Sequence, residues 1–124
     1  MSTAAEVTGA TLPDAAGEDS FSLLPELIGR RSAESPQRAP VVHHSLGGTF
    51  AIRKDNWKLI VDNLGSGGFS SPKNVKPKPG EPAGQLYDLS SDPSEKNNLY
   101  DQNAQVVKAL RAQLNTIRSS GRSR

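Results

Sequence analysis

The residues of this chain that could do chemistry gather in one stretch, "VVHHSLGGTFAIRKDNWKLIV", residues 41–61. It holds both histidines, His43 and His44, and Ser45 follows them directly. Two histidines suggest a metal site, and a histidine beside a hydroxyl suggests nucleophilic catalysis. Neighbouring strand residues point to opposite faces, so His43 and His44 cannot bind one metal ion together. Adjacency to Ser45 is not a catalytic triad either, because a general base needs a partner that orients it.

Cationic side chains follow the histidines at Arg53, Lys54 and Lys58. Guanidinium and ammonium groups pair well with sulfate, phosphate or carboxylate, so an anionic ligand is one interpretation. The other interpretation is a solvated hairpin edge, where lysines also protect an edge strand against aggregation. The residue types alone favour the solvated edge.

The rest of the chain gives no better case for catalysis or metal binding. The sequence has no cysteine, which excludes disulfides, thiolate metal sites and cysteine nucleophiles. In "DPSE" we expect a compact helix start, where Asp92 caps, Pro93 occupies the first position and Glu95 reaches back. The residues alone therefore predict no catalytic group and no metal site.

Length, composition and charge limit the size of the fold and the classes of partner. The 124 residues suit one small domain, and hydrophobic residues (34%) and aromatic residues (5%) are few. The net charge of +2 comes largely from a tail with Arg118, Arg122 and Arg124. This is a solvated terminus rather than a nucleic-acid site. No apolar run approaches the roughly 20 residues of a membrane helix, and "MSTAAEVTGA" lacks the features of a signal peptide. We expect no nucleic acid and no membrane as partners.

The elements that must position these groups divide the chain at residue 40. Residues 1–39 are expected to hold the end of a truncated helix over 1–8, stopped by Gly9, and a connecting loop. Within that loop, four apolar residues predict one buried helical turn with Pro25 near its start. These residues are Leu23, Leu24, Leu27 and Ile28.

Residues 40–124 predict an α+β unit, a small antiparallel β-sheet covered by a C-terminal amphipathic helix. A hairpin over 41–61 follows from the alternation in "TFAIR" and "WKLIV" around "KDN", where Asp55 or Asn56 takes the left-handed position. A long loop over 62–84 comes next, of a length that is often functional or disordered. A strand follows at 85–89 and a helix at 103–119. The helix carries an apolar stripe at Val107, Leu110, Leu114 and Ile117, which favours packing on its own sheet over service as an exposed binding helix.

Several stretches together resemble the C-terminal region of bacterial sulfatases of the arylsulfatase and N-acetylgalactosamine-6-sulfatase type. They are "GEDSFSLLPELIG", "VVHHSLGGTFAIRKDNWKLI", "GSGGFSSP" and "GQLYDLSSDPSEKNNLYD". The most specific pattern is "LYDLxxDPxExxNL", from Leu86 to Leu99, and "FAIRxxxWKLI" runs from Phe50 to Ile60. The resemblance covers residues 1 to about 120, and four ordered motifs carry it.

The resemblance implies a larger enzyme than this chain. Complete sulfatases have an N-terminal α/β domain with a C/S-x-P/A-x-R motif that yields formylglycine, a calcium site, and catalytic Lys and His residues. Their smaller C-terminal subdomain packs beside the active-site cleft. This sequence resembles only that subdomain. "ESPQR" has Glu34 where the nucleophile would stand, and glutamate cannot become formylglycine. Calcium and formylglycine are thus expected in the complete family and not in this chain.

We therefore expect the C-terminal fragment of a sulfatase, inactive alone, that shapes a substrate cleft. Its expected partners are a sulfatase catalytic domain, missing or separately encoded, and a sulfated sugar or aryl sulfate. We expect His43 or His44, and then Arg53, to contact substrate, unless these residues only hold the sheet together. A second hypothesis is a free-standing binding module for sulfated glycans or for a separate catalytic half, and a third is a non-functional gene remnant. The family is typically periplasmic or secreted, and location stays open.

Overall fold

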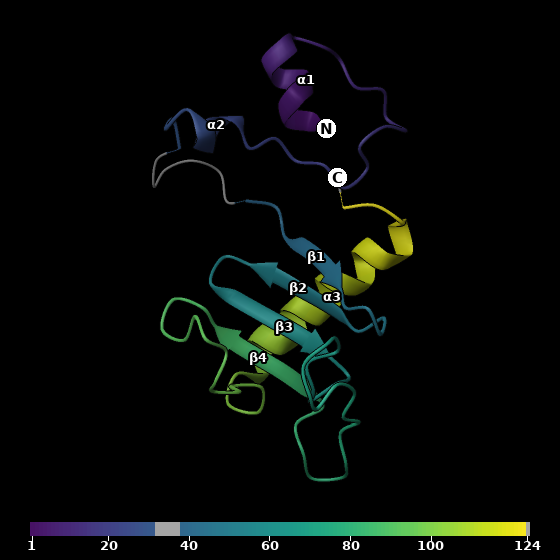
Figure 1. The fold of residues 1–124 in the computed structure, drawn as a ribbon, viewed down its shortest axis with the longest axis vertical. Coiled ribbons are helices and arrows are strands. Elements are labelled where there is room, and N and C mark those ends of the chain that lie inside the picture. Colours follow the sequence, from purple (N-terminus) through teal and green to yellow (C-terminus); the bar gives the residue numbers. More distant parts are fainter. Residues whose placement is uncertain (32–37, 124) are drawn as a thin grey trace.

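The computed structural model of the protein describes residues 1–31 and 38–123. Its body is one antiparallel sheet of four strands in the order β1-β2-β3-β4, and the long helix α3 crosses one face of it (Figure 1). The predicted α+β class is confirmed. The elements are β1 Val41–His44, β2 Phe50–Lys54, β3 Trp57–Val61, β4 Gly84–Asp88 and α3 Ala104–Ser120.

The hairpin of β2 and β3 forms where the alternating pattern predicts it. Arg53 pairs with Lys58, and Lys54 pairs with Trp57 across the turn. Asp55 has a φ of 52°, in the left-handed region that the turn requires and that Asp tolerates. β1 adds to the other edge of β2, so three consecutive strands form a meander that β4 extends.

The core lies between the sheet and α3. The least exposed large side chains come from β2, β3, β4 and α3, with exposed fractions of 0% for Ile52, Leu59 and Leu86 and 1% for Leu114. Val107 and Leu110 of the predicted stripe are also buried, and Ile117 packs against the cluster. The stripe therefore covers the sheet of its own chain, because a sheet face of this apolarity must be shielded from water.

The predicted helix start at "DPSE" is wrong, because the structure has a turn there. Asp92 accepts hydrogen bonds from the backbone N–H groups of Lys96 and Asn97, both at 2.7 Å, which closes a turn rather than capping a helix. Glu95 has a φ of 55° and does not reach back. Its carboxylate instead accepts from the Lys58 Nζ at 2.6 and 2.8 Å, a contact across 37 positions that local sequence patterns do not reveal.

Asn98, within the same motif, joins β4 to the segment that leads into α3. Its Oδ1 accepts from the backbone N–H groups of Leu86 and Tyr100, and its Nδ2 donates to the carbonyl of Gly84. The most specific motif of the sequence is thus a structural clasp along the edge strand. Satisfying the free N–H groups of an edge strand also removes a site for unwanted strand pairing.

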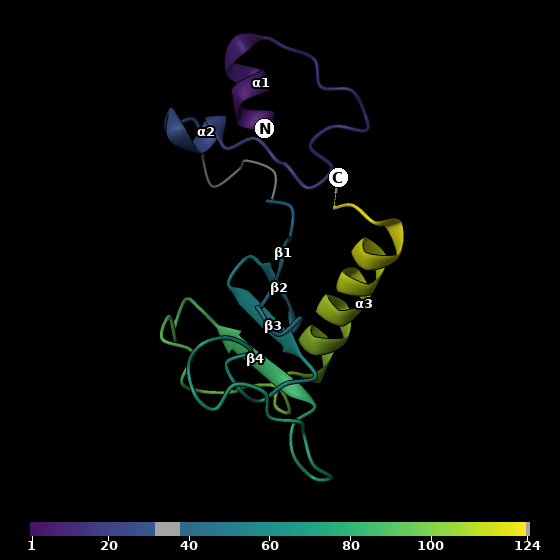
Figure 2. The same ribbon diagram turned by 45° about the vertical axis from the view of Figure 1, so that its right-hand side comes forward.

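The N-terminal segment forms two short helices beyond one end of the sheet, α1 Ser2–Thr8 and α2 Leu24–Leu27 (Figures 1 and 2). Gly9 ends α1 with a φ of 69°, as predicted. The predicted helical turn with Pro25 near its start is present as α2, but its predicted burial is wrong, since Leu27 is 71% exposed and Ile28 is 49% exposed. α2 lies beside α1 instead, with the Leu23 N–H donating to Thr3 Oγ1 at 3.0 Å.

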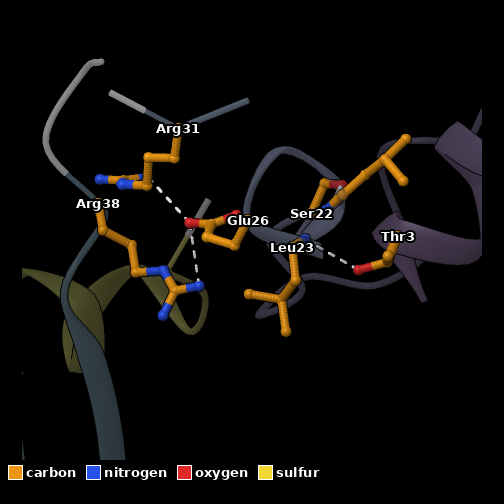
Figure 3. A network of polar contacts seen from close by, with 7 residues as sticks. Thr3, Ser22, Leu23, Glu26, Arg31 and Arg38 are labelled. Carbon is orange, nitrogen blue, oxygen red and sulfur yellow. Dashed lines mark hydrogen bonds and ion pairs between the residues drawn. The ribbon is translucent and has the colours of Figure 1, made fainter. Parts of the chain in front are cut away.

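Glu26 of α2 is the centre of a small ionic cluster (Figure 3). Its Oε1 accepts from Arg31 at 2.9 Å and from Arg38 at 3.1 Å. Its own backbone N–H and then the charges of Arg38 and Arg31 lower the pKa of Glu26. The cluster ties α2 to the segment that enters β1. In "ESPQR", Arg38 is this ion-pair partner, and Glu34 lies outside the described residues.

Among the described residues, no helix has both the length and the apolarity needed to cross a membrane.

Candidate functional site

The two histidines lie on the edge strand β1 and face opposite sides of the sheet. His44 is opposite Phe50 in the β1–β2 register, and His43 is opposite Ala51. Side chains directly across an antiparallel pair share a face, so His44 is on the side of α3 and His43 on the other. The two imidazoles therefore lie on different faces of the sheet, as predicted for neighbouring residues of one strand.

His44 belongs to an aromatic and cationic cluster on the α3 side. Its ring centroid lies 5.7 Å from that of Phe50, with the planes tilted by 57°. The guanidinium of Arg118, in the last turn of α3, lies 4.4 Å from the same Phe50 centroid, within cation–π range. The His44 Nδ1 lies 3.0 Å from the Ser45 carbonyl, which only accepts, so Nδ1 carries the proton. In neutral His44 the Nε2 remains as an acceptor.

A cavity of about 370 Å³ opens at this edge of the sheet. β1, the end of α3 and the segment around Phe21 enclose it, and its walls include both histidines, Phe50 and Arg118. Two of the three predicted contact residues thus meet in one cavity. Arg53, the third, is not among its lining residues.

Arg53 lies farther along the sheet, on the face that α3 does not cover. It is directly opposite Lys58, and two like charges in that arrangement repel each other. The carboxylate of Glu95 offsets this by pairing with Lys58. The Arg53 side chain makes no hydrogen bond or ion pair with another described residue, so its guanidinium keeps its full donor capacity on the open face.

His43 shares that open face, and its surroundings disfavour a positive charge. Desolvation by burial is the main cause that lowers the pKa of His43, and the charges of Lys58 and His44 act in the same direction. Glu95 acts against them and only in part. Neutral His43 can accept a hydrogen bond from a sugar hydroxyl, which a protonated imidazole cannot do.

We expect an NMR titration to give His43 a pKa below the ordinary 6.5. The unfolded chain then holds this proton more tightly, so stability is complete above the ordinary pKa and is lost as the pH falls through the folded one. Lys58→Met should raise the pKa of His43, because it removes a repelling cation and leaves Glu95 unpaired. The same resonance in the urea-unfolded chain is the reference, and equal values in both states would contradict the expectation.

Phe50 and Arg118 are the residues of this cluster that the sequence did not single out. Phe50 was predicted only as part of an alternating strand pattern, and Arg118 only as part of a basic, solvated terminus. A regular edge strand places Phe50 beside His44, but nothing local indicates that the last turn of α3 reaches the same place. The length of the helix, which ends at Gly121 with a φ of 72°, brings Arg118 there.

Metal and formylglycine chemistry find no place in the described part of the chain. No three His, Asp or Glu side chains gather within residues 1–31 and 38–123 in a way that could hold a metal ion. The sequence has no cysteine, and its one resembling run, "ESPQR", has Glu34 rather than serine at the position that would become formylglycine. The residues present therefore do not fit either group, and the site can bind and orient a ligand by hydrogen bonds, charge and ring contacts.

No family model matches the chain. The sequence is 35% identical over 108 residues, 87% of this chain, to an N-acetylgalactosamine-6-O-sulfatase of Bacteroides thetaiotaomicron. The chain spans only 20% of that relative's length.

The fold leads to the same class of protein. A solved sulfatase structure from Bacteroides thetaiotaomicron, described with the metabolism of multiple glycosaminoglycans, superposes with a TM-score of 0.72 at 31% identity. The match covers 95% of this chain and 24% of that one. The chain is thus similar to sulfatases in sequence and fold, over a portion that fits their C-terminal region. The resemblance predicted from the motifs is confirmed.

Proposed function

We propose that this chain serves as the C-terminal region of a sulfate ester hydrolase, where it shapes the substrate cleft beside a catalytic domain. The similarity to a sulfatase over nearly the whole chain, but over a fifth of the relative, supports this role. Calcium and formylglycine would belong to the rest of such an enzyme. The exposed apolar residues of the N-terminal segment, Val7, Leu27 and Ile28, suit contact with a further domain.

The cavity at the β1 edge is the part that would touch substrate. Phe50 and His44 offer ring faces for a sugar, and Arg118 offers a guanidinium for a sulfate group. The single observation that carries the proposal is that both predicted histidines line one cavity with an arginine held over an aromatic ring. A sulfated sugar, such as the substrate in the name of the curated relative, combines these two requirements.

Binding of N-acetylgalactosamine 6-sulfate to the ¹⁵N-labelled chain tests this proposal. We expect saturable shifts at residues 41–50 and at Arg118, and weaker binding of unsulfated N-acetylgalactosamine. Arg118→Met should weaken the binding of the sulfated ligand at least about fivefold, since a hydrogen bond to a charged group is lost. Lys108→Met, on the same helix outside the cavity, is the matched control.

Two results would argue against the role. One is the absence of shifts along β1 at tens of millimolar ligand in a chain whose spectrum is well dispersed. The other is equal loss of affinity in the Arg118→Met and Lys108→Met variants, which would mean that the attraction is only to net charge.

A further inference from the structure

The long glycine-rich loop after β3 encloses a second cavity, away from the β1 cavity. It measures about 250 Å³, and residues of the β1–β2 loop and of the segment 62–76 line it. Figure 1 shows this loop in teal beyond the end of β3. We propose that this cavity is a binding site for one acidic sugar unit, a pyranose that carries a carboxylate group.

The loop is ordered by a buried asparagine. Asn63 is 4% exposed, and its Oδ1 accepts from the backbone N–H groups of Gly65 at 2.9 Å and Val75 at 2.8 Å. Its Nδ2 donates to Thr49 Oγ1 and to the Lys73 carbonyl, both at 3.3 Å. All the hydrogen-bonding groups of this side chain are thus used to hold the cavity walls in place, so the walls are set before any ligand arrives.

Backbone contacts fix the two loops to each other. Gly67 accepts from the Gly47 N–H at 3.2 Å and donates to the Lys73 carbonyl at 2.6 Å. A Cβ at Gly65 would lie 2.6 Å from the backbone oxygens of Pro72 and Lys73, so only glycine fits there. Preorganised walls lower the entropic cost of binding, which distinguishes this loop from an ordinary flexible connection.

The cavity wall presents both hydrogen-bond donors and hydrogen-bond acceptors that a ligand could use. Asn74 and Lys76 make no hydrogen bond or ion pair with another described residue, so a carboxamide and an ammonium are available to a ligand. The Thr49 hydroxyl accepts from Asn63 and keeps its own proton to donate. Asp62 uses Oδ1 for Arg111 and leaves Oδ2 as an acceptor. Sugar hydroxyls both donate and accept, so this mixture suits them.

Charge and size narrow the ligand class. Arg111 already balances Asp62, which leaves Lys76 as the uncompensated cation of the cavity wall. A ligand with one negative charge therefore fits better than a neutral sugar. Drug-sized ligands occupy roughly 300–1,000 Å³, so a smaller cavity suits a single ring. The site does not depend on the β1 cavity, and either can fail without the other.

Glucuronic acid is the probe for this site, with glucose and inorganic sulfate as comparisons. We expect saturable shifts at residues 47–49 and 62–76 with glucuronic acid, weaker ones with glucose, and none along β1 beyond the loop. Lys76→Met should weaken binding at least about fivefold, and Lys78→Met, two residues farther along the same loop, should stay within about twofold. Asn74→Ala should weaken the binding of glucuronic acid and of glucose to the same extent.

Three outcomes would overturn the proposal. The first is a well-dispersed spectrum without shifts in these loops at tens of millimolar glucuronic acid. The second is equal effects of the two lysine substitutions. The third is inorganic sulfate binding as tightly as glucuronic acid with the same pattern of shifts, which would make the cavity a simple anion site. Shifts confined to residues 41–46 and Arg118 are a form of the first outcome, and they would support ligand binding at the β1 cavity alone.

Discussion

Alanine in place of Asn63 is expected to destabilise the fold by about 2–4 kcal/mol, because two backbone N–H donors lose their acceptor in a closed loop. The N–H groups of Gly65 and Val75 both depend on Asn63 Oδ1, and this side chain is only 4% exposed, so water cannot easily take its place. Buried donors without an acceptor carry the full desolvation cost. Urea denaturation followed by tryptophan fluorescence measures the change.

Asn74 provides the matched control for this experiment. It is an asparagine on the same loop, it is exposed, and it makes no hydrogen bond with another described residue. Asn74→Ala should therefore shift stability by no more than about 0.5 kcal/mol. If both substitutions had the same small effect, the loop would not be held by Asn63, and the preorganised cavity inferred above would lose its basis.

Sequence periodicity was sufficient for the parts of the fold that depend on local pattern. The alternation around the Asp55 turn predicted β2 and β3, and the stripe that includes Leu114 predicted α3 and its buried face. In each case the burial of one face and the spacing of its side chains express the same physical requirement. The short "QLYDL" strand was predicted one residue late, which is the usual uncertainty of an element boundary.

Elements that rely on distant contacts escaped prediction. Glu95 looked like a capping residue because its distance from Asp92 suits a helix start, yet its ion pair with Lys58 holds a turn instead. Leu27 looked like a core residue because it is apolar, but α2 lies beside α1 and leaves it exposed. The long loop was predicted only to be functional or disordered, because nothing local shows that one asparagine can satisfy donors that lie far apart in the chain.

In the candidate site, too, the residues on a local pattern could be predicted and those brought in by distant contacts could not. His43 and His44 were accessible to sequence reasoning because histidines are rare in this chain and sit on a predicted strand. Their partner Arg118 was not, because only the crossing of α3 over the sheet brings its guanidinium to Phe50. The site is therefore a product of tertiary packing, and its integrity depends on how firmly α3 is held.

Leu114→Ala is expected to cost about 2–5 kcal/mol, the range for removing a fully buried leucine side chain from a core. Leu114 is 1% exposed in the cluster with Ile52 and Leu59, so the space it leaves opens at the centre of the helix–sheet contact. Small domains are stable by about 5–15 kcal/mol, so this one change can remove a large part of the total. Thermal unfolding by circular dichroism measures it.

Leu46→Ala is the control for that experiment, since Leu46 is 79% exposed and should change stability by no more than about 0.5 kcal/mol. A cooperative transition that falls sharply in Leu114→Ala and not in Leu46→Ala would mean that the sheet and α3 fold without a further domain, as a free-standing module requires. Equal behaviour of the two variants, or no cooperative transition in the unaltered chain, would mean that α3 is not held by this core alone. The site at Phe50 and Arg118 would then need the rest of a sulfatase to form, and ligand binding by the isolated chain would be lost with it.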